Sequence, residues 1–480
     1  MMNAKILLAG LMTLVSATNT FAQTSVERPP QYVLLAFDGS KENAFWQESR
    51  SFARGLELML NQPVKFTYFI SGVYWLTDEN SKIYQGPNRR AGRSDIGFGQ
   101  KTEDLVTRID HVNNAFEEGH EIASHANGHF DASDLINKKK PTFNPWSEAD
   151  WTWEFQQFNN LLFGAFKNNS IKPSAKYPKN GYAFSQENIT GFRAPVLGVT
   201  EGLWPTLKKF GFKYDTSKVN FPWYWPTKDK HGIWQYPLAE IPIVGTAKKT
   251  LSMDYNFYVS QSRGVKDEAN KELYQKQMYD SYMKYFNDNY YGRRAPIHIG
   301  HHFSRWNGGA YWEAMKAFAA DVCGLPEVKC VTYNEYTQWL ESLNQDSLNQ
   351  MRKGNFNKLQ RPQHLAVNQK IYHTQIDMVA NQDRIKFKSK GLPQRENLMK
   401  VITVDGREVH GDTIELEQLR QTLPRNSKVE ISAKIFNDDG VEIQSTTHFI
   451  QNLNTEFEIL SEEPWEGRAL MGDLPEAHFE

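Results

Sequence analysis

Residues 120–129, with the sequence HEIASHANGH, combine a short strand with two histidines. The apolar and small side chains at 120–125 predict a buried strand, and the helical pattern before it ends at Gly119. His125 and His129 are four positions apart, so in one helical turn both imidazoles would lie on the same face and could bind one metal ion. This spacing alone is weak evidence, but its place at the end of a strand favours a metal site.

The segment from Gln31 to about Gln345 alternates between strand-like and helix-like patterns. We predict strands at residues 32–38, 64–70, 120–125, 189–193, 212–215, 295–301 and 328–332. Helical patterns lie between them, and two of these begin with capping boxes at Ser147 and Thr332. Repeated strand–helix units predict a parallel sheet, closed or open.

Ionisable residues close five of these strands: Asp38, His125, Arg193, Asp215 and His301. Each has an ordinary explanation as a turn cap, a helix cap or a surface ion pair. In parallel α/β folds, however, functional sites gather at the C-terminal ends of the strands. The five residues together therefore predict an active site at that end of the sheet.

The composition excludes several other classes of protein. The 480 residues include 55 Lys and Arg against 56 Asp and Glu, a balance that favours neither nucleic acid nor an anionic membrane as a partner. Two cysteines, Cys323 and Cys330, make neither a disulfide scaffold nor a cysteine zinc motif. In an oxidising compartment these two could pair, and free thiols are the alternative.

The first 22 residues have the pattern of a signal peptide. Lys5 precedes an apolar run at residues 6–15, and Thr20 and Ala22 occupy the −3 and −1 positions of a cleavage site. A buried first helix is the alternative. No later apolar run reaches the roughly 18 residues that indicate a membrane span. We therefore predict an exported protein, periplasmic or secreted, without a membrane span.

A polar stretch at residues 345–369 predicts a linker, and strands alone follow it. These strands are predicted at residues 371–379, 384–390, 398–404, 413–416, 428–436 and 441–450. Turn residues separate them, which is typical of a small β-sandwich. The predicted division is a signal peptide at 1–22, a catalytic domain at 31–343, the linker at 345–369, a β-sandwich-like accessory domain at 370–452 and an acidic tail at 453–480.

The motifs of residues 31–343 resemble those of the polysaccharide deacetylases, carbohydrate esterase family four. The similar stretches are AFDGS at 36–40, GHEIASH at 119–125 with His129, RAP at 193–195, Asp215, and IGH at 299–301. The resemblance implies a distorted (β/α) barrel and a divalent metal, usually zinc. It also implies an enzyme that hydrolyses non-peptide C–N amide bonds, removing N-acetyl groups from amino sugars.

The resemblance also implies roles for individual residues. His125 and His129 would be metal ligands, and Asp38 would be the general base, oriented by Arg193. His301, kept protonated by Asp215, would donate a proton to the leaving amine. His302, which follows His301 directly, is an alternative for this last role.

One position departs from the family's pattern, in which two adjacent acids serve as base and metal ligand. Asp38 takes the position of the base, and Gly39 replaces the ligand. Either Asp38 becomes the third metal ligand, or it stays the base and the metal takes another oxygen. Asp131 and Asp134 are the nearest candidates in the sequence.

We therefore expect an exported, metal-dependent enzyme that deacetylates an N-acetylated polysaccharide or oligosaccharide. A non-catalytic glycan-binding protein on a deacetylase fold is the alternative, because Gly39 replaces an acid. Glycoside hydrolysis would leave the histidine pair unexplained. The aromatic run at 221–226 would stack on sugar rings or pack in a loop, and residues 77–102 predict a long loop over the mouth of the barrel. The identity of the glycan and the oligomeric state stay open.

Export gives the first testable prediction. We expect the mature protein from its native host to begin near Gln23, because cleavage after Ala22 removes the leader. N-terminal sequencing of protein recovered outside the cytoplasm checks this. A mature chain that keeps Met1 and stays in the cytoplasm would contradict both the leader and the export.

Overall fold

The computed structural model describes residues 26–133, 145–177 and 180–362 as continuous segments. Further along the chain it describes residues 375–380, 384–390, 399–405, 407–409, 413–422, 428–436, 442–452 and 457–459. The predicted signal peptide at 1–22 lies outside the described residues, as does most of the predicted acidic tail. Both stay predictions.

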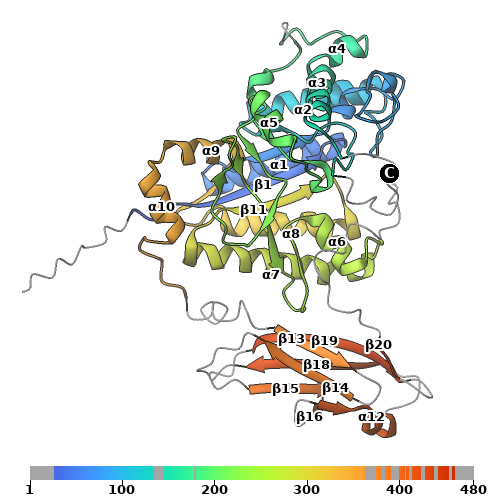
Figure 1. The fold of residues 1–480 in the computed structure, drawn as a ribbon, viewed down its shortest axis with the longest axis vertical. Coiled ribbons are helices and arrows are strands. Elements are labelled where there is room, and N and C mark those ends of the chain that lie inside the picture. Colours follow the sequence, from blue (N-terminus) through green and yellow to red (C-terminus); the bar gives the residue numbers. More distant parts are fainter. Residues whose placement is uncertain are drawn as a thin grey trace, which may run out of the picture.

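Strand β1 (Gln31–Gly39) lies inside the main sheet and pairs in parallel with β11 (Ile297–His302) and β2 (Phe66–Ile70). The sheet continues through β3 (Glu121–Ser124), β4 (Gly191–Phe192), β5 (Tyr214–Asp215), β8 (Trp234–Gln235) and the antiparallel β7 (Thr227–Lys228), and β12 (Val328–Cys330) pairs with the start of β1. Each strand predicted between residues 32 and 332 belongs to this sheet. The sheet curls into a distorted barrel, and this confirms the predicted fold class (Figure 1).

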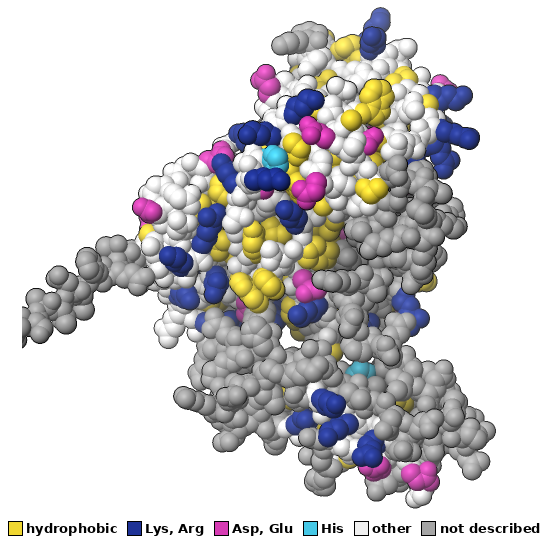
Figure 2. All heavy atoms as spheres, viewed as in Figure 1, with side chains coloured by type: hydrophobic (Ala, Val, Ile, Leu, Met, Phe, Trp, Pro, Cys, Tyr) yellow, Lys and Arg dark blue, Asp and Glu magenta, His cyan; other side chains and the backbone are white. Residues whose placement is uncertain are grey.

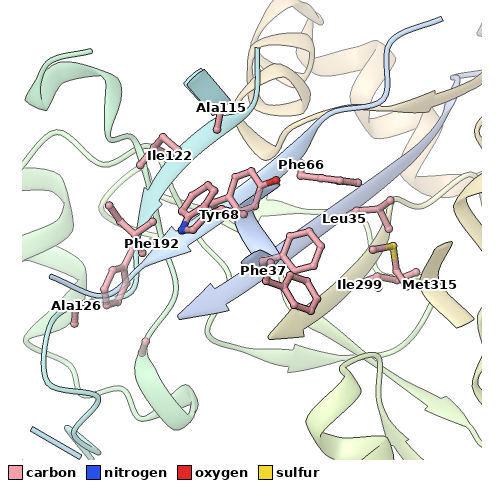
Figure 3. Packing of buried hydrophobic residues seen from close by; sticks show 14 of the residues in the cluster. Leu35, Phe37, Phe66, Tyr68, Ala115, Ile122, Ala126, Phe192, Ile299 and Met315 are labelled. Atoms are coloured by element: carbon pink, nitrogen blue, oxygen red, sulfur yellow. The ribbon is translucent and has the colours of Figure 1, made fainter. Parts of the chain in front are cut away.

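Alternate side chains of β1 enter two different apolar cores. Leu34 and Ala36 belong to the core that fills the barrel, together with Tyr214 from β5. Leu35 and Phe37 belong to the core between the sheet and the helices (Figure 3). Because both faces are buried, the strand is a nearly continuous apolar run, as expected in a parallel sheet.

Helices pack around the sheet, most of them on its outer face. They are α1 (Asn43–Leu60), α2 (Thr102–Glu117), α3 (Glu148–Phe163), α4 (Ala165–Asn168), α5 (Leu203–Lys209), α6 (Asp254–Ser262), α7 (Lys271–Asp288), α8 (Trp306–Val322) and α9 (Tyr333–Ser342). The two predicted capping boxes are confirmed: the side chains of Ser147 and Thr332 accept hydrogen bonds from the backbone N–H groups of Asp150 and Glu335.

A second sheet, absent from the sequence prediction, reaches the edge of β11 that faces away from β1. Its strands are β6 (Val219–Asn220), β9 (Leu238–Pro242) and β10 (Lys249–Leu251). Beyond β10, the carbonyl of Ser252 accepts a hydrogen bond from Gly300 N at 2.9 Å, and Ser252 Oγ donates to the carbonyl of His298 at 2.6 Å. These bonds place Asp254, the first residue of α6, beside the C-terminal end of β11.

The first part of the predicted linker at 345–369 is a helix and not a linker. Helix α10 (Gln345–Lys353) forms this part, with Asn344 as its N-cap. Leu348 and Met351 of this helix are buried in the same core as β1 and α9. The stretch is polar overall, but these two apolar residues share one helical face, which is enough to dock the helix.

Cys323 and Cys330 form a disulfide, so the pairing that the sequence left open occurs in the structure. It joins the end of α8 to β12 across a short turn. No helix among the described residues is long and apolar enough to span a membrane. On the face in Figure 2, Lys and Arg side chains are spread with Asp and Glu among them, in keeping with the balanced charge.

The described C-terminal residues form two antiparallel sheets and one short helix, α12 (Leu416–Thr422). The strands are β13 (Gln375–Ala380), β14 (Arg384–Lys390), β15 (Met399–Val404), β16 (Arg407–Val409), β17 (Thr413–Glu415), β18 (Lys428–Phe436), β19 (Glu442–Asn452) and β20 (Phe457–Ile459). They bury a core of their own, which includes Phe387, Ile402 and Ile431. This agrees with the predicted all-β, sandwich-like region.

Candidate active site

The residues predicted at the strand ends come from the same end of the sheet. Asp38 lies near the end of β1, His125 directly follows β3, and Arg193 directly follows β4. In the parallel pairing of β1 with β11, Asp38 is opposite His302 and Phe37 is opposite His301. Asp38, His125 and Arg193 therefore lie at one edge of the sheet, as the sequence predicts, and the strand pairing decides which side chains share a face.

Asp38 and Arg193 form a buried ion pair. Arg193 Nη1 donates to Asp38 Oδ1 at 2.7 Å, and both side chains are almost completely buried. Thr216 Oγ1 and the Tyr333 hydroxyl accept the other guanidinium hydrogen bonds, at 2.5 and 3.3 Å. The guanidinium also lies over the ring of Phe69, 4.4 Å from its centroid. These contacts fix Arg193, and Arg193 in turn fixes the carboxylate.

The charges around Asp38 keep it ionised. Burial opposes the charged form, but the charge and the hydrogen bond of Arg193, together with His302, outweigh burial and hold the pKa of Asp38 below its usual value. An ionised carboxylate with one oxygen anchored can accept a proton through the other. This is the state that a general base requires.

The two histidines of the motif lie together, but the turn that carries them is not helical. Their ring centroids are 5.3 Å apart with an interplanar angle of 61°. Ala126 and His129 have φ values of 52° and 59°, so the chain enters the left-handed region twice between the strand and the end of the motif. The spacing predicted a helical turn, which is wrong. It also predicted that the two imidazoles lie close together, and they do.

Hydrogen bonding and burial prepare His125 as a ligand. Its Nδ1 lies 2.8 Å from the carbonyl of Arg193, which makes Nδ1 the protonated nitrogen and leaves the lone pair on Nε2. Burial lowers the pKa of His125, and it lowers the pKa of His129 to about 3. Both imidazoles are therefore neutral near pH 7, which is the form that binds a metal.

Two of the three predicted metal ligands have the chemistry that a divalent metal requires. His125 and His129 supply neutral imidazoles, and the ionised Asp38 is close enough to influence the pKa of both. Among the residues that the structure describes, no three His, Cys, Asp or Glu side chains are grouped so that they could hold a metal ion. The predicted set Asp38, His125 and His129 is thus not assembled as a complete group of ligands.

Asp131 and Asp134 are the two alternative sources of a carboxylate oxygen for the metal. Asp131 Oδ1 accepts hydrogen bonds from the backbone N and the hydroxyl of Ser133, at 2.9 and 2.6 Å, so this carboxylate caps a turn. Asp134 lies outside the described residues.

Of the two adjacent histidines, His302 faces Asp38. His301 instead points to the helix layer, where its Nε2 lies 3.3 Å from the hydroxyl of Tyr282 and its ring contacts Phe37. Burial lowers the pKa of His301 to about 4, so it is neutral near pH 7. His301 therefore lies against the helix layer, although its Nδ1 is also 3.7 Å from Asp254 Oδ2, and the geometry favours the alternative, His302, as the proposed proton donor.

A carboxylate that the sequence analysis missed holds His302. Asp254 Oδ1 lies 2.7 Å from His302 Nδ1, and Asp254 Oδ2 accepts the backbone N–H of His302 at 2.8 Å. Burial disfavours the charged imidazole, but Asp254 outweighs burial and raises the pKa of His302 above its usual value. No strand pattern was recognised before residue 254, so nothing in the sequence marked this aspartate as a strand-end residue.

Asp215 does not act on His301 as predicted. Its carboxylate oxygens accept hydrogen bonds from the hydroxyl and the backbone N of Ser217, at 2.6 and 3.1 Å. The Ser217 hydroxyl in turn accepts the backbone N–H of Ala194, next to Arg193. Asp215 therefore supports the loop that carries Arg193. The sequence predicted its place at the end of a strand but not its partner.

The aromatic run at 221–226 divides into two parts. Trp225 is buried, donates from Nε1 to the carbonyl of Arg293 at 2.9 Å and packs near Trp339. Phe221 and Trp223 stack with their centroids 5.5 Å apart, and Phe221 is exposed. At least Trp225 thus has the packing role that was the alternative to sugar binding.

Comparison with known proteins finds likeness in structure alone. No family model matches the sequence, and no curated protein matches it. The solved structures that match include a protein from Mycobacterium smegmatis assigned as a polysaccharide deacetylase, with a TM-score of 0.38 and 15% identity, covering 71% of this chain and 99% of that one.

Two further matches belong to carbohydrate esterase family four. One is an esterase from Streptomyces lividans, with a TM-score of 0.29, 11% identity and coverage of 62% of this chain and 90% of that one. The other, from Bacillus anthracis, is described as a pseudoenzyme of the family, with a TM-score of 0.31, 8% identity and coverage of 64% and 66%. At these identities and TM-scores the likeness carries no activity over to this chain.

The position that departs from the family's pattern has an unusual backbone. Gly39 has a φ of 93°, and the following Ser40 has a φ of 88°. No described atom lies within 4 Å of the place where a Cβ on Gly39 would be. A side chain at this position would therefore have room, at the cost of a left-handed backbone that favours glycine.

The pairing of His302 with Asp254 gives a prediction about proton affinity. Replacing Asp254 with Asn removes the charge that raises the pKa of His302, so this pKa should fall. NMR titration of the imidazole signals measures it directly. The matched control is Asp215→Asn, a buried carboxylate hydrogen-bonded to Ser217, which should leave the His302 titration in place. An unchanged His302 pKa in Asp254→Asn would contradict the assignment.

Proposed function

We propose that the chain is an exported, metal-dependent hydrolase that removes N-acetyl groups from an amino-sugar-containing polysaccharide or oligosaccharide. The observation that carries the proposal is the pair of oppositely tuned groups on β1 and β11. Arg193 favours the ionised form of Asp38, and Asp254 favours the protonated form of His302. Two neighbouring groups whose pKa values are pushed apart by their surroundings are typical of a base and an acid.

These residues support amide hydrolysis in two proton transfers. Asp38 would accept a proton from the water that attacks the acetamide carbonyl, while Arg193 keeps the carboxylate in place. The C–N bond then breaks, and His302 would donate its proton to the leaving sugar amine, so that acetate and a free amine result. A divalent metal held by His125 and His129 would supply Lewis-acid activation of the water and the carbonyl.

Export is supported by two independent features. Residues 1–22 have the pattern of a signal peptide, and Cys323 and Cys330 form a disulfide. Structural disulfides are typical of proteins outside the reducing cytosol. The periplasm and the extracellular space both satisfy this condition.

A second candidate function is glycan binding without catalysis. Gly39 stands where the family's pattern has a second acid, and the described residues do not group a third ligand with the two histidines. This alternative predicts that the protein binds an N-acetylated glycan but releases no acetate with any divalent metal. Acetate release from a panel of chitin, peptidoglycan and other N-acetylated glycans therefore distinguishes the two functions.

The Asp38→Asn variant tests the proposed base. Asparagine keeps an oxygen for Arg193 but cannot take up the proton, so turnover should fall by about 10² to 10⁴. Metal content, measured on the same preparation, should not change. If Asp38 is instead the third ligand, metal and activity disappear together. Because the change weakens a buried ion pair, thermal unfolding is measured alongside to confirm that the variant is folded.

The Gly39→Asp variant tests whether the missing acid can be restored. The side chain has room, and a φ of 93° should cost roughly 1–2 kcal/mol of stability in a residue other than glycine. We expect tighter binding of Zn²⁺, measured by competition with a chromophoric chelator. Gly39→Asn is the matched control, since it has the same size and backbone cost without the charge. Equal Zn²⁺ affinity in the two variants would show that position 39 does not reach the metal.

A further inference from the structure

The turn between the two histidines is held in an unfavourable conformation. Ala126 and His129 both have positive φ, which residues other than glycine rarely adopt. Such a conformation persists only where the surrounding structure determines it. The contacts of residues 126–128 therefore show what sets the positions of His125 and His129.

Two buried side chains bind consecutive backbone N–H groups of this turn. Glu154, on α3, accepts the N–H of Asn127 through Oε1 at 3.0 Å. The hydroxyl of Tyr84 accepts the N–H of Gly128 at 3.2 Å and donates to the carboxylate of Glu154, 3.1 Å from each oxygen. The side-chain amide of Asn127 also donates to the carbonyl of Glu154 at 2.9 Å. Turn, tyrosine and glutamate thus form one closed network.

Packing restricts the same turn. A Cβ on Gly128 would lie 2.8 Å from Tyr84 Cε1 and 2.6 Å from Phe130 Cε2, so the two rings leave room only for glycine. Tyr84 is fully buried and stacks on Phe130. The backbone N–H of Asp95 donates to the carbonyl of Gly128 at 2.9 Å from the other side. The position of the turn is therefore determined by hydrogen bonds and by contact.

Glu154 is unusual as a purely structural residue. It is 1% exposed, and burial raises its pKa to about 7. Burying a carboxylate costs free energy unless hydrogen bonds compensate, and here the Tyr84 hydroxyl and the Asn127 N–H supply them.

We propose that Glu154 and Tyr84 are positioning residues that hold the turn between His125 and His129 and thereby set the separation and orientation of the two imidazoles. The inference rests on the proposed function in one respect, which is the divalent metal at these histidines. It also assigns a role to the segment 77–102, which supplies Tyr84 and Asp95 to the turn. Besides its predicted place over the mouth of the barrel, this segment supports the turn that carries the two histidines.

The Tyr84→Phe variant tests the proposal, with Tyr285→Phe as its matched control. Tyr285 is also buried, and its hydroxyl also accepts a backbone N–H, that of His298 at 3.2 Å, while it donates to the carbonyl of Pro296 at 3.1 Å. Each change removes one buried hydroxyl that donates to an oxygen and accepts a backbone N–H. Thermal unfolding of both variants measures the general loss of stability.

The affinity for metal should differ between the two variants. We expect Tyr84→Phe to weaken Zn²⁺ binding by about 10-fold or more, the usual effect of losing a group that orients the ligands. The Co²⁺-loaded protein should show a changed visible spectrum. Tyr285→Phe should match the wild type in both measurements. Equal Zn²⁺ affinity in Tyr84→Phe and Tyr285→Phe would overturn the proposal.

A measurement without metal separates this inference from the proposed function. In the metal-free protein, Tyr84→Phe should shift or broaden the imidazole NMR signals of His125 and His129, and Tyr285→Phe should not. If the wild type binds no metal, the proposed metal site is wrong. This measurement still tests whether Tyr84 positions the two histidines. Unchanged signals in Tyr84→Phe overturn the inference whatever the activity of the protein. Glu154→Gln, which keeps the size of the side chain, should give the same change should Tyr84→Phe fail to fold.

Discussion

The ion pair between Arg193 and Asp38 is the interaction on which the site depends. Each of the three guanidinium nitrogens of the buried Arg193 donates a hydrogen bond, to β1, to the loop after β5 and to the start of α9. Its backbone carbonyl also sets the tautomer of His125. One residue therefore fixes both the carboxylate and the first imidazole of the site. Buried pairs contribute little net stability, so its value lies in the geometry that it imposes.

The two ionised pairs of the site have opposite effects on proton affinity. Arg193 favours the deprotonated form of Asp38, and Asp254 favours the protonated form of His302. The parallel register of β1 and β11 places the two groups opposite each other, at the end of the sheet where the loops converge. A site that holds a base and an acid in this way suits hydrolysis, in which one proton is taken from water and one is given to the leaving group.

The fold alone does not decide between an enzyme and a binding protein, because folds host many functions and the site determines which one is present. Here both proposed proton-transfer groups are present, whereas the proposed ligand set offers two imidazoles and a carboxylate that is already bound to Arg193. Gly39 has the room but not the backbone conformation that an acid would prefer. The structure therefore supports the proposed proton transfers more fully than the proposed metal site.

Local patterns in the sequence were enough to locate most of the parallel strands of the main sheet, the capping boxes at Ser147 and Thr332, and the strand-end positions of Asp38, His125 and Arg193, because these depend on neighbours in the chain. The choice of His302 over His301 needed the tertiary structure, since both faces of β11 are buried and alternation cannot show which one faces the base. Asp254 was also out of reach, because it meets β11 only where the segment after β10 closes the barrel, 48 residues before His302. The conformation of the histidine turn is likewise set by Tyr84 and Glu154, which lie far from it in sequence and beside it in the fold.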